Sequence, residues 1–186
     1  MRNRVFFYKQ PWGEKYRPYL EISFYSKNGS ELITRGLVDT GADRFLLPYS
    51  LGRELGFTAS TEDMRKKPET KGVGGELNSL DKETEVVINH RHSGKIHRIK
   101  ISAAWIIPTE EEFIFLNKLK SEIDVLKMNV KLHPTDELRK LYFDKQNEYA
   151  SAHNRLEPDI LIGREFMENF AYLTFVHEKD SSKSYF

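Results

Sequence analysis

The sequence contains no cysteine among its 186 residues. Without thiols the chain forms no disulfide, builds no thiolate metal site and offers no cysteine nucleophile. The absence also favours a reducing compartment, and we therefore expect a cytoplasmic protein.

Long hydrophobic runs are missing as well. At the N-terminus, Lys9, Gln10 and Pro11 interrupt the chain before an apolar run of signal-peptide length develops. No apolar stretch approaches the ~18 residues that a membrane-spanning helix needs. We expect a soluble chain with no membrane partner.

Neither sign of charge dominates the chain. It carries 29 lysines and arginines against 28 aspartates and glutamates, a formal net charge of +1. There is no basic field to attract nucleic acid, so we expect no nucleic-acid partner. The hydrophobic share of 39% is sufficient for an ordinary core, and the length fits one domain or one domain with an insertion.

The first hundred residues show strand patterns. Residues 19–25 alternate apolar and polar side chains, the period of a half-buried strand. Asn28-Gly29 follows and predicts a tight hairpin, because both residues tolerate positive φ, with residues 32–38 as the returning strand. Further strands are expected at residues 5–8, 83–89, 95–107, 159–163 and 172–176, and short helices at residues 48–55 and 164–169.

The pattern becomes helical in the middle of the chain. Thr109 and Glu112 form a capping box, and apolar residues follow at helical spacing from Leu116 to Val130. A second helix is expected over residues 135–150. We interpret residues 109–155 as a helical hairpin inserted into a β domain made of residues 1–108 and 156–186.

We expect the two antiparallel helices to pack on the outside of the β domain, away from the Asp39 axis. A second hypothesis is that the hairpin overhangs the cleft, which would limit substrates to flexible segments. The apolar stripe is covered by the second helix, through Leu138, Leu141 and Tyr142, together with the outer sheet, or it forms a groove for a partner.

Residues 37–42, Leu-Val-Asp-Thr-Gly-Ala, are the most informative segment. A buried strand turns sharply there and presents the carboxylate of Asp39. Thr40 is suited to a hydrogen bond with a symmetric neighbour, and Gly41 leaves the backbone open to a substrate chain. An ordinary strand ending in an Asx-type turn uses the same residue types, so Asp-Thr-Gly alone does not distinguish a catalytic site from an ordinary turn.

Three further segments strengthen the functional interpretation. Leu161-Ile162-Gly163 repeats the apolar-apolar-Gly pattern and is followed at once by Arg164. A short predicted helix lies just after Asp39, and residues 72–75 form a glycine-rich hairpin. In this order the segments resemble the retropepsin-like aspartic proteases, the family of the retroviral proteases, over residues 1–107 and 156–177.

The resemblance implies a mainly β fold, a closed β-barrel like a single lobe of an acid protease. It makes Asp39 the catalytic carboxylate and Thr40 the residue that locks two loops together at a dimer axis. Gly41 would bind the substrate backbone, and Asp43 would pair with Arg164 in a partly buried ion pair. Structural support would come from Ala42, Gly163 and Arg164, and further substrate binding from Asp43, Val73, Gly74 and Gly75.

The chain also departs from the family pattern. Glu165 stands where Asp or Asn is usual, and the glycine-rich hairpin is brief and less apolar than in viral members. Residues 173–175 are similar to the terminal strand that viral members use in the dimer interface, but the chain continues beyond them.

The implied activity is aspartic endopeptidase chemistry. An ionised carboxylate takes a proton from water while a second, protonated carboxyl donates to the peptide carbonyl. The two groups lie too close for both to ionise and share a proton. Because the chain has one Asp-Thr-Gly, the second Asp39 must come from another copy, by isologous two-fold symmetry. The partners are then a second copy and a peptide or protein substrate. No metal or organic cofactor is implied.

One alternative belongs to a different functional class. In that alternative the chain is a catalytically weak retropepsin-like dimerisation or peptide-binding module.

The histidines offer a possible metal site that we set aside. His90, His92 and His97 surround one hairpin, but a metal site needs supporting carboxylates, and solvated histidines are the simpler interpretation. Trp12 and Trp105 are interpreted as core or interface aromatics.

Overall fold

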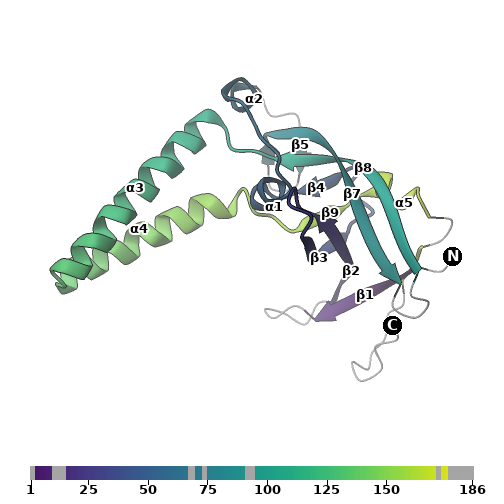
Figure 1. The fold of residues 1–186 in the computed structure, drawn as a ribbon, viewed down its shortest axis with the longest axis horizontal. Coiled ribbons are helices and arrows are strands. Elements are labelled where there is room, and N and C mark those ends of the chain that lie inside the picture. Colours follow the sequence, from purple (N-terminus) through teal and green to yellow (C-terminus); the bar gives the residue numbers. More distant parts are fainter. Residues whose placement is uncertain are drawn as a thin grey trace. The chain divides into compact units, whose positions relative to one another are not determined.

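The computed structural model describes residues 3–9, 16–66, 70–72, 75–90, 95–170 and 173–175. Strands dominate the described fold, as predicted (Figure 1). The elements are β1 (Asn3–Lys9), β2 (Tyr16–Tyr25), β3 (Glu31–Val38), β4 (Phe45–Leu47), α1 (Tyr49–Glu54), α2 (Thr61–Arg65), β5 (Thr70–Gly72), β6 (Gly75–Leu77), β7 (Ser79–His90), β8 (Lys95–Ile106), α3 (Glu110–Leu132), α4 (Asp136–Asn154), β9 (Ile160–Ile162), α5 (Arg164–Met167) and β10 (Leu173–Phe175).

The main sheet has the strand order β10-β1-β2-β3-β9-β4-β8-β7. A bridge between Ser23 of β2 and Val87 of β7 joins the strands from β2 to β7 into a ring of six. The mainly β architecture is thus confirmed, while the closed barrel stays a prediction because the described bridge involves one residue pair. β5 and β6 form a separate two-stranded sheet.

The chain divides into two compact units. Unit 1 comprises residues Met1–Thr58, Leu80–Trp105 and Asp159–Phe186, and unit 2 comprises residues Ala59–Ser79 and Ile106–Pro158. Residues 59–79 therefore group with the two long helices, whereas the predicted boundaries at 108 and 156 place them with the β strands. Those boundaries stay a prediction, as does the packing of the helices on the β domain.

Aromatic packing holds the core of unit 1 together. The ring of Phe45 in β4 lies 6.2 Å from that of Phe24 in β2 and 5.6 Å from that of Phe166 in α5, both in edge-on geometry. All three rings are almost completely buried, and burial of each such side chain contributes roughly 1.5–3 kcal/mol. The cluster fixes β4 and α5 against β2.

The interpretation of Trp105 as a core residue is confirmed. It is fully buried, stacks on Tyr49 at 5.8 Å and donates its indole N–H to the Tyr49 carbonyl oxygen at 3.1 Å. A Cβ atom on Gly52 would lie 2.1 Å from the indole nitrogen, so α1 approaches the ring through a glycine. Trp12 lies outside the described residues.

The β2–β3 hairpin is present, but its turn differs from the prediction. Only Gly29 has positive φ, at 84°, and Asn28 instead uses its side chain to accept the Ser30 N–H at 3.1 Å. The Gly29 N–H donates to the Ser26 carbonyl at 2.9 Å, a turn closed by a left-handed glycine. The Ser26 N–H also donates to the Ser30 carbonyl at 2.9 Å, so the turn is longer than a two-residue hairpin turn.

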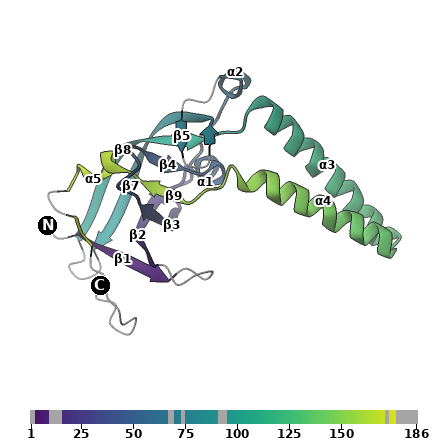
Figure 2. The same cartoon turned by 180° about the vertical axis from the view of Figure 1, so that it is seen from behind.

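The helical hairpin α3–α4 forms as the capping pattern predicts. The Thr109 hydroxyl accepts the Glu112 N–H, the Glu112 carboxylate accepts the Thr109 N–H, and the two helices lie side by side (Figure 2). Leu116 and Leu119 are buried, whereas Leu141, which we expected to cover the stripe, is 46% exposed. No helix in the described part of the chain is both long and apolar enough to cross a membrane.

Candidate active site

Strand β9 lies between the two strands that flank Asp39. β3 pairs with β9 in parallel, with Val38 opposite Ile162, and β4 pairs with β9 antiparallel, with Leu46 opposite Leu161. β3 and β4 are consecutive strands, yet they are separated in the sheet by a strand from near the C-terminus. The loop after β3 must therefore pass over the end of β9, and Asp39 begins that loop.

Backbone hydrogen bonds hold this loop at both ends. The Asp39 N–H donates to the Ile162 carbonyl oxygen at 3.1 Å. On the other side, the N–H groups of Arg164 and Glu165 donate to the carbonyls of Ala42 and Asp43 at 2.9 and 3.0 Å. The first turn of α5 thus binds the loop through two of the N–H groups that a helix start leaves free.

The Asp39 side chain also shapes the loop. Its Oδ1 atom accepts the Gly41 N–H at 2.8 Å, and its carbonyl accepts the Ala42 N–H at 3.2 Å, which together make an Asx-type turn. Asp39 is half-buried, while Thr40 and Gly41 are exposed. An ordinary strand end can make the same turn, so the turn alone does not favour the catalytic interpretation. The backbone hydrogen bonds from the loop to β9 and α5 go beyond such a turn and fix the position of Asp39.

Gly163 has a steric reason to be glycine. A Cβ atom there would lie 2.3 Å from the carbonyl oxygen of Arg44 and 2.7 Å from its backbone nitrogen. Real Cβ atoms do not approach a backbone so closely, so the chain after the Asp39 loop passes directly over this residue. The apolar-apolar-Gly pattern therefore marks the point where the two segments cross.

The predicted ion pair between Asp43 and Arg164 is present, but its predicted partial burial is wrong. The two side chains are in direct contact, and they are 72% and 62% exposed. Sequence reasoning missed a second ion pair, in which Arg44 contacts Asp81 of β7. No local pattern signals that contact, because it depends on how β7 is placed beside the loop.

The glycine-rich segment forms a strand pair, with Gly72 opposite Gly75. Val73 and Gly74 lie outside the described residues, and the substrate-binding role of all three predicted residues, including Gly75, stays a prediction. Among the described residues no group of three or more histidine, aspartate or glutamate side chains is placed to hold a metal ion. His92 and the side chain of His90 are outside that description.

The terminal strand pairs within its own chain. β10 runs parallel to β1, with Asn3 opposite Leu173 and Val5 opposite Phe175, at the end of the strand order. Its predicted use in a dimer interface stays a prediction.

Comparisons with known proteins give little further support. No protein-family model and no curated protein matches the chain. A solved structure of EIAV protease, complexed with the inhibitor HBY-793, is 25% identical over 54% of this chain and 83% of that chain, with a TM-score of 0.29. At that TM-score the likeness carries no argument, and the functional argument depends on the residues of the Asp39 loop.

Proposed function

We propose that the chain is a retropepsin-like aspartic endopeptidase that works as a homodimer with one Asp39 from each copy. The observation that carries the proposal is the clamped Asp39 loop, held between Ile162 of β9 and the first N–H groups of α5. A carboxylate needs such a fixed support when it must keep its distance from a partner carboxylate and a water molecule.

The exposure of the loop suits a symmetric partner. Thr40 and Gly41 are exposed at the turn, while Val38 just before them is buried. A two-fold axis beside Asp39 would bring each loop against its own image, with Thr40 in contact across the axis. This arrangement supplies two carboxylates from a chain that has one Asp-Thr-Gly.

In the proposed reaction the two Asp39 carboxyl groups share one proton. The ionised group takes a proton from a bound water, the water oxygen attacks the peptide carbonyl carbon, and the protonated group donates to the carbonyl oxygen. Collapse of the tetrahedral intermediate then breaks the C–N bond as the nitrogen receives a proton. Gly41 and Asp43, with Val73, Gly74 and Gly75 of the glycine-rich hairpin, are proposed to bind the peptide substrate.

A pool of diverse peptides tests the proposal. We expect new cleavage products by mass spectrometry from the wild type and none from Asp39→Asn. Asparagine keeps an Oδ1 acceptor for the Gly41 N–H, so this variant is expected to stay folded. If neither protein cleaves any peptide although both are folded and dimeric, the alternative of a dimerisation or peptide-binding module holds instead.

A further inference from the structure

The first residue of α3 contacts α2, the helix that precedes the β5–β6 hairpin in the chain. Arg65, the last residue of α2, donates from Nε and Nη2 to the two carboxylate oxygens of Glu110, at 2.6 and 2.7 Å. Such a paired contact fixes direction as well as distance, because both planar groups must align. Glu110 is the first residue of α3, so this ion pair joins α2 to α3 directly.

The residue just after the hairpin is tied to the same segment. Asn78 accepts the Ile107 N–H with its backbone carbonyl at 2.9 Å. Its side chain is buried and donates to the carbonyls of Asp63 and Met64, at 3.4 Å each. Asn78 therefore joins the end of the hairpin to α2 and to the segment that leads into α3.

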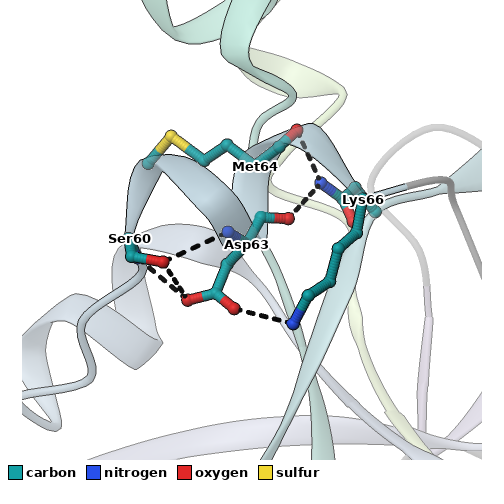
Figure 3. A network of polar contacts seen from close by, with 5 residues as sticks. Ser60, Asp63, Met64 and Lys66 are labelled. Atoms are coloured by element: carbon teal, nitrogen blue, oxygen red, sulfur yellow. Dashed lines mark hydrogen bonds and ion pairs between the residues drawn. The ribbon is translucent and has the colours of Figure 1, made fainter.

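α2 itself is held in shape by a polar network (Figure 3). The Ser60 hydroxyl accepts the Asp63 N–H at 3.2 Å, and the Asp63 carboxylate accepts the Ser60 N–H and hydroxyl at 3.0 and 2.8 Å. Lys66 contacts the same carboxylate at 3.0 Å. The capping bonds from Ser60, then the Lys66 contact, hold the pKa of Asp63 far below its ordinary value of 3.8.

The first turn of α3 also contacts the residue that follows α4. Glu112, which caps α3 through Thr109, contacts Arg155 just after α4 at 3.3 Å. The first turn of α3 is thus joined to the end of α4 as well as to α2. Residues 107–112 form the root of the helical hairpin.

We propose that the α3–α4 hairpin is the support that positions the β5–β6 hairpin, with Arg65, Asn78 and Glu110 as the positioning residues. β5 and β6 form a sheet of their own, so pairing with the larger sheet does not place them. β6 continues through Asn78 into β7, and the two sequence neighbours of the hairpin, α2 before it and Asn78 after it, both contact the root of α3. The β5–β6 hairpin and the helices accordingly belong to one compact unit.

The consequence for catalysis rests on the proposed function, in which this hairpin binds peptide. Loosening its support weakens substrate binding, whereas the Asp39 loop keeps its own hydrogen bonds to β9 and α5. The effect therefore falls on KM more than on kcat. A change in KM alone distinguishes a positioning role from a general loss of folded enzyme. Loss of folded enzyme lowers the apparent kcat, because a smaller fraction of the protein is active.

Backbone hydrogen exchange of the β5–β6 amides tests the support without any activity. The singles Arg65→Glu and Glu110→Arg are compared with the double exchange Arg65→Glu/Glu110→Arg, which restores opposite charges. We expect roughly two- to fivefold faster exchange in each single, in line with a paired surface contact, and recovery in the double. Glu122→Gln is the matched control, since it breaks the α3–α4 contact of Glu122 with Lys145 at 3.0 Å and leaves the root intact.

Asn78→Ala is the second variant, because it removes the amide from both carbonyls and keeps the backbone bond to Ile107. It is expected to speed the same exchange more than either charge variant does. Unchanged β5–β6 exchange in Asn78→Ala and in both singles overturns the proposal, and so does a double that exchanges like the singles. Amides of β9 serve as the reference for global unfolding.

The kinetic measurement uses any peptide that the wild type cleaves. A KM raised roughly two- to fivefold in Arg65→Glu, with kcat nearly kept and recovery in the double, supports the proposal. A lowered kcat at constant KM contradicts it. If the wild type cleaves no peptide, the proposed function fails while the exchange measurement still decides whether α3 positions the hairpin.

Discussion

Arg164 holds the loop after Asp39 in two ways: its backbone N–H donates to the Ala42 carbonyl at 2.9 Å, and its side chain pairs with Asp43. The first contact belongs to the start of α5 and survives any side-chain substitution except proline. The second is exposed and screened by solvent. The backbone contact is therefore expected to carry more of the loop's stability than the ion pair does.

Replacing Arg164 by alanine tests this division. The free energy of unfolding is expected to fall by less than about 1 kcal/mol, because an exposed ion pair contributes little. Urea denaturation of Arg164→Ala, Asp43→Ala and the double variant isolates the pair. A coupling of several kcal/mol would contradict the exposed geometry and place the pair in a buried contact of the functional assembly.

Replacing Gly163 by alanine tests the crossing of the two segments. The added Cβ would lie 2.3 Å from the Arg44 carbonyl oxygen, so the backbone must shift, at a cost of roughly 1–3 kcal/mol. Peptidase activity is expected to fall with it, because the shift moves the Asp39 loop. Gly41→Ala is the matched control for stability, since its nearest contact would be the Asp39 side chain at 3.2 Å. Equal melting temperatures for Gly163→Ala and the wild type would show that the crossing is not this close.

The Asp63 carboxylate predicts a pH dependence. The Ser60 hydrogen bonds and Lys66 lower the pKa of Asp63 in the folded protein below its ordinary value of 3.8. The ionised carboxylate of Asp63 therefore stabilises the fold at any pH above 3.8. That contribution is lost as the pH falls below 3.8 toward the folded pKa. Asp63→Asn should therefore be less stable than the wild type at neutral pH, with a gap that narrows below 3.8. Urea denaturation across this range measures the gap, and a gap that widens in acid would have the wrong sign.

The Asp39 loop was predictable because its signals are local. The apolar residues before Asp39 require a buried strand, Thr40 and Gly41 follow as turn residues, and Leu161-Ile162-Gly163 marks a second buried strand. The capping box at Thr109 likewise announced α3. In the same way, Ser60 and Asp63 carry a capping pattern for α2 that sequence reasoning missed.

Other features depend on where distant segments meet. The exposure of the Asp43–Arg164 pair depends on which elements pack around the loop, and residue spacing in the sequence does not predict that packing. The Arg44–Asp81 and Arg65–Glu110 ion pairs join residues far apart in the sequence, and each needs the placement of a whole strand or helix. The grouping of the glycine-rich hairpin with α3 follows from such contacts and was beyond a pattern-based division into domains.

The most direct test of the central claim is a subunit-mixing measurement. Wild type and Asp39→Asn are mixed in equal amounts, allowed to exchange subunits at constant total concentration, and assayed on a cleaved peptide. If each site needs an Asp39 from both copies, random pairing leaves about one quarter of the rate of the undiluted wild type, because mixed dimers are inactive. A rate of about one half would contradict the account, since each chain would then act with its own carboxylate alone.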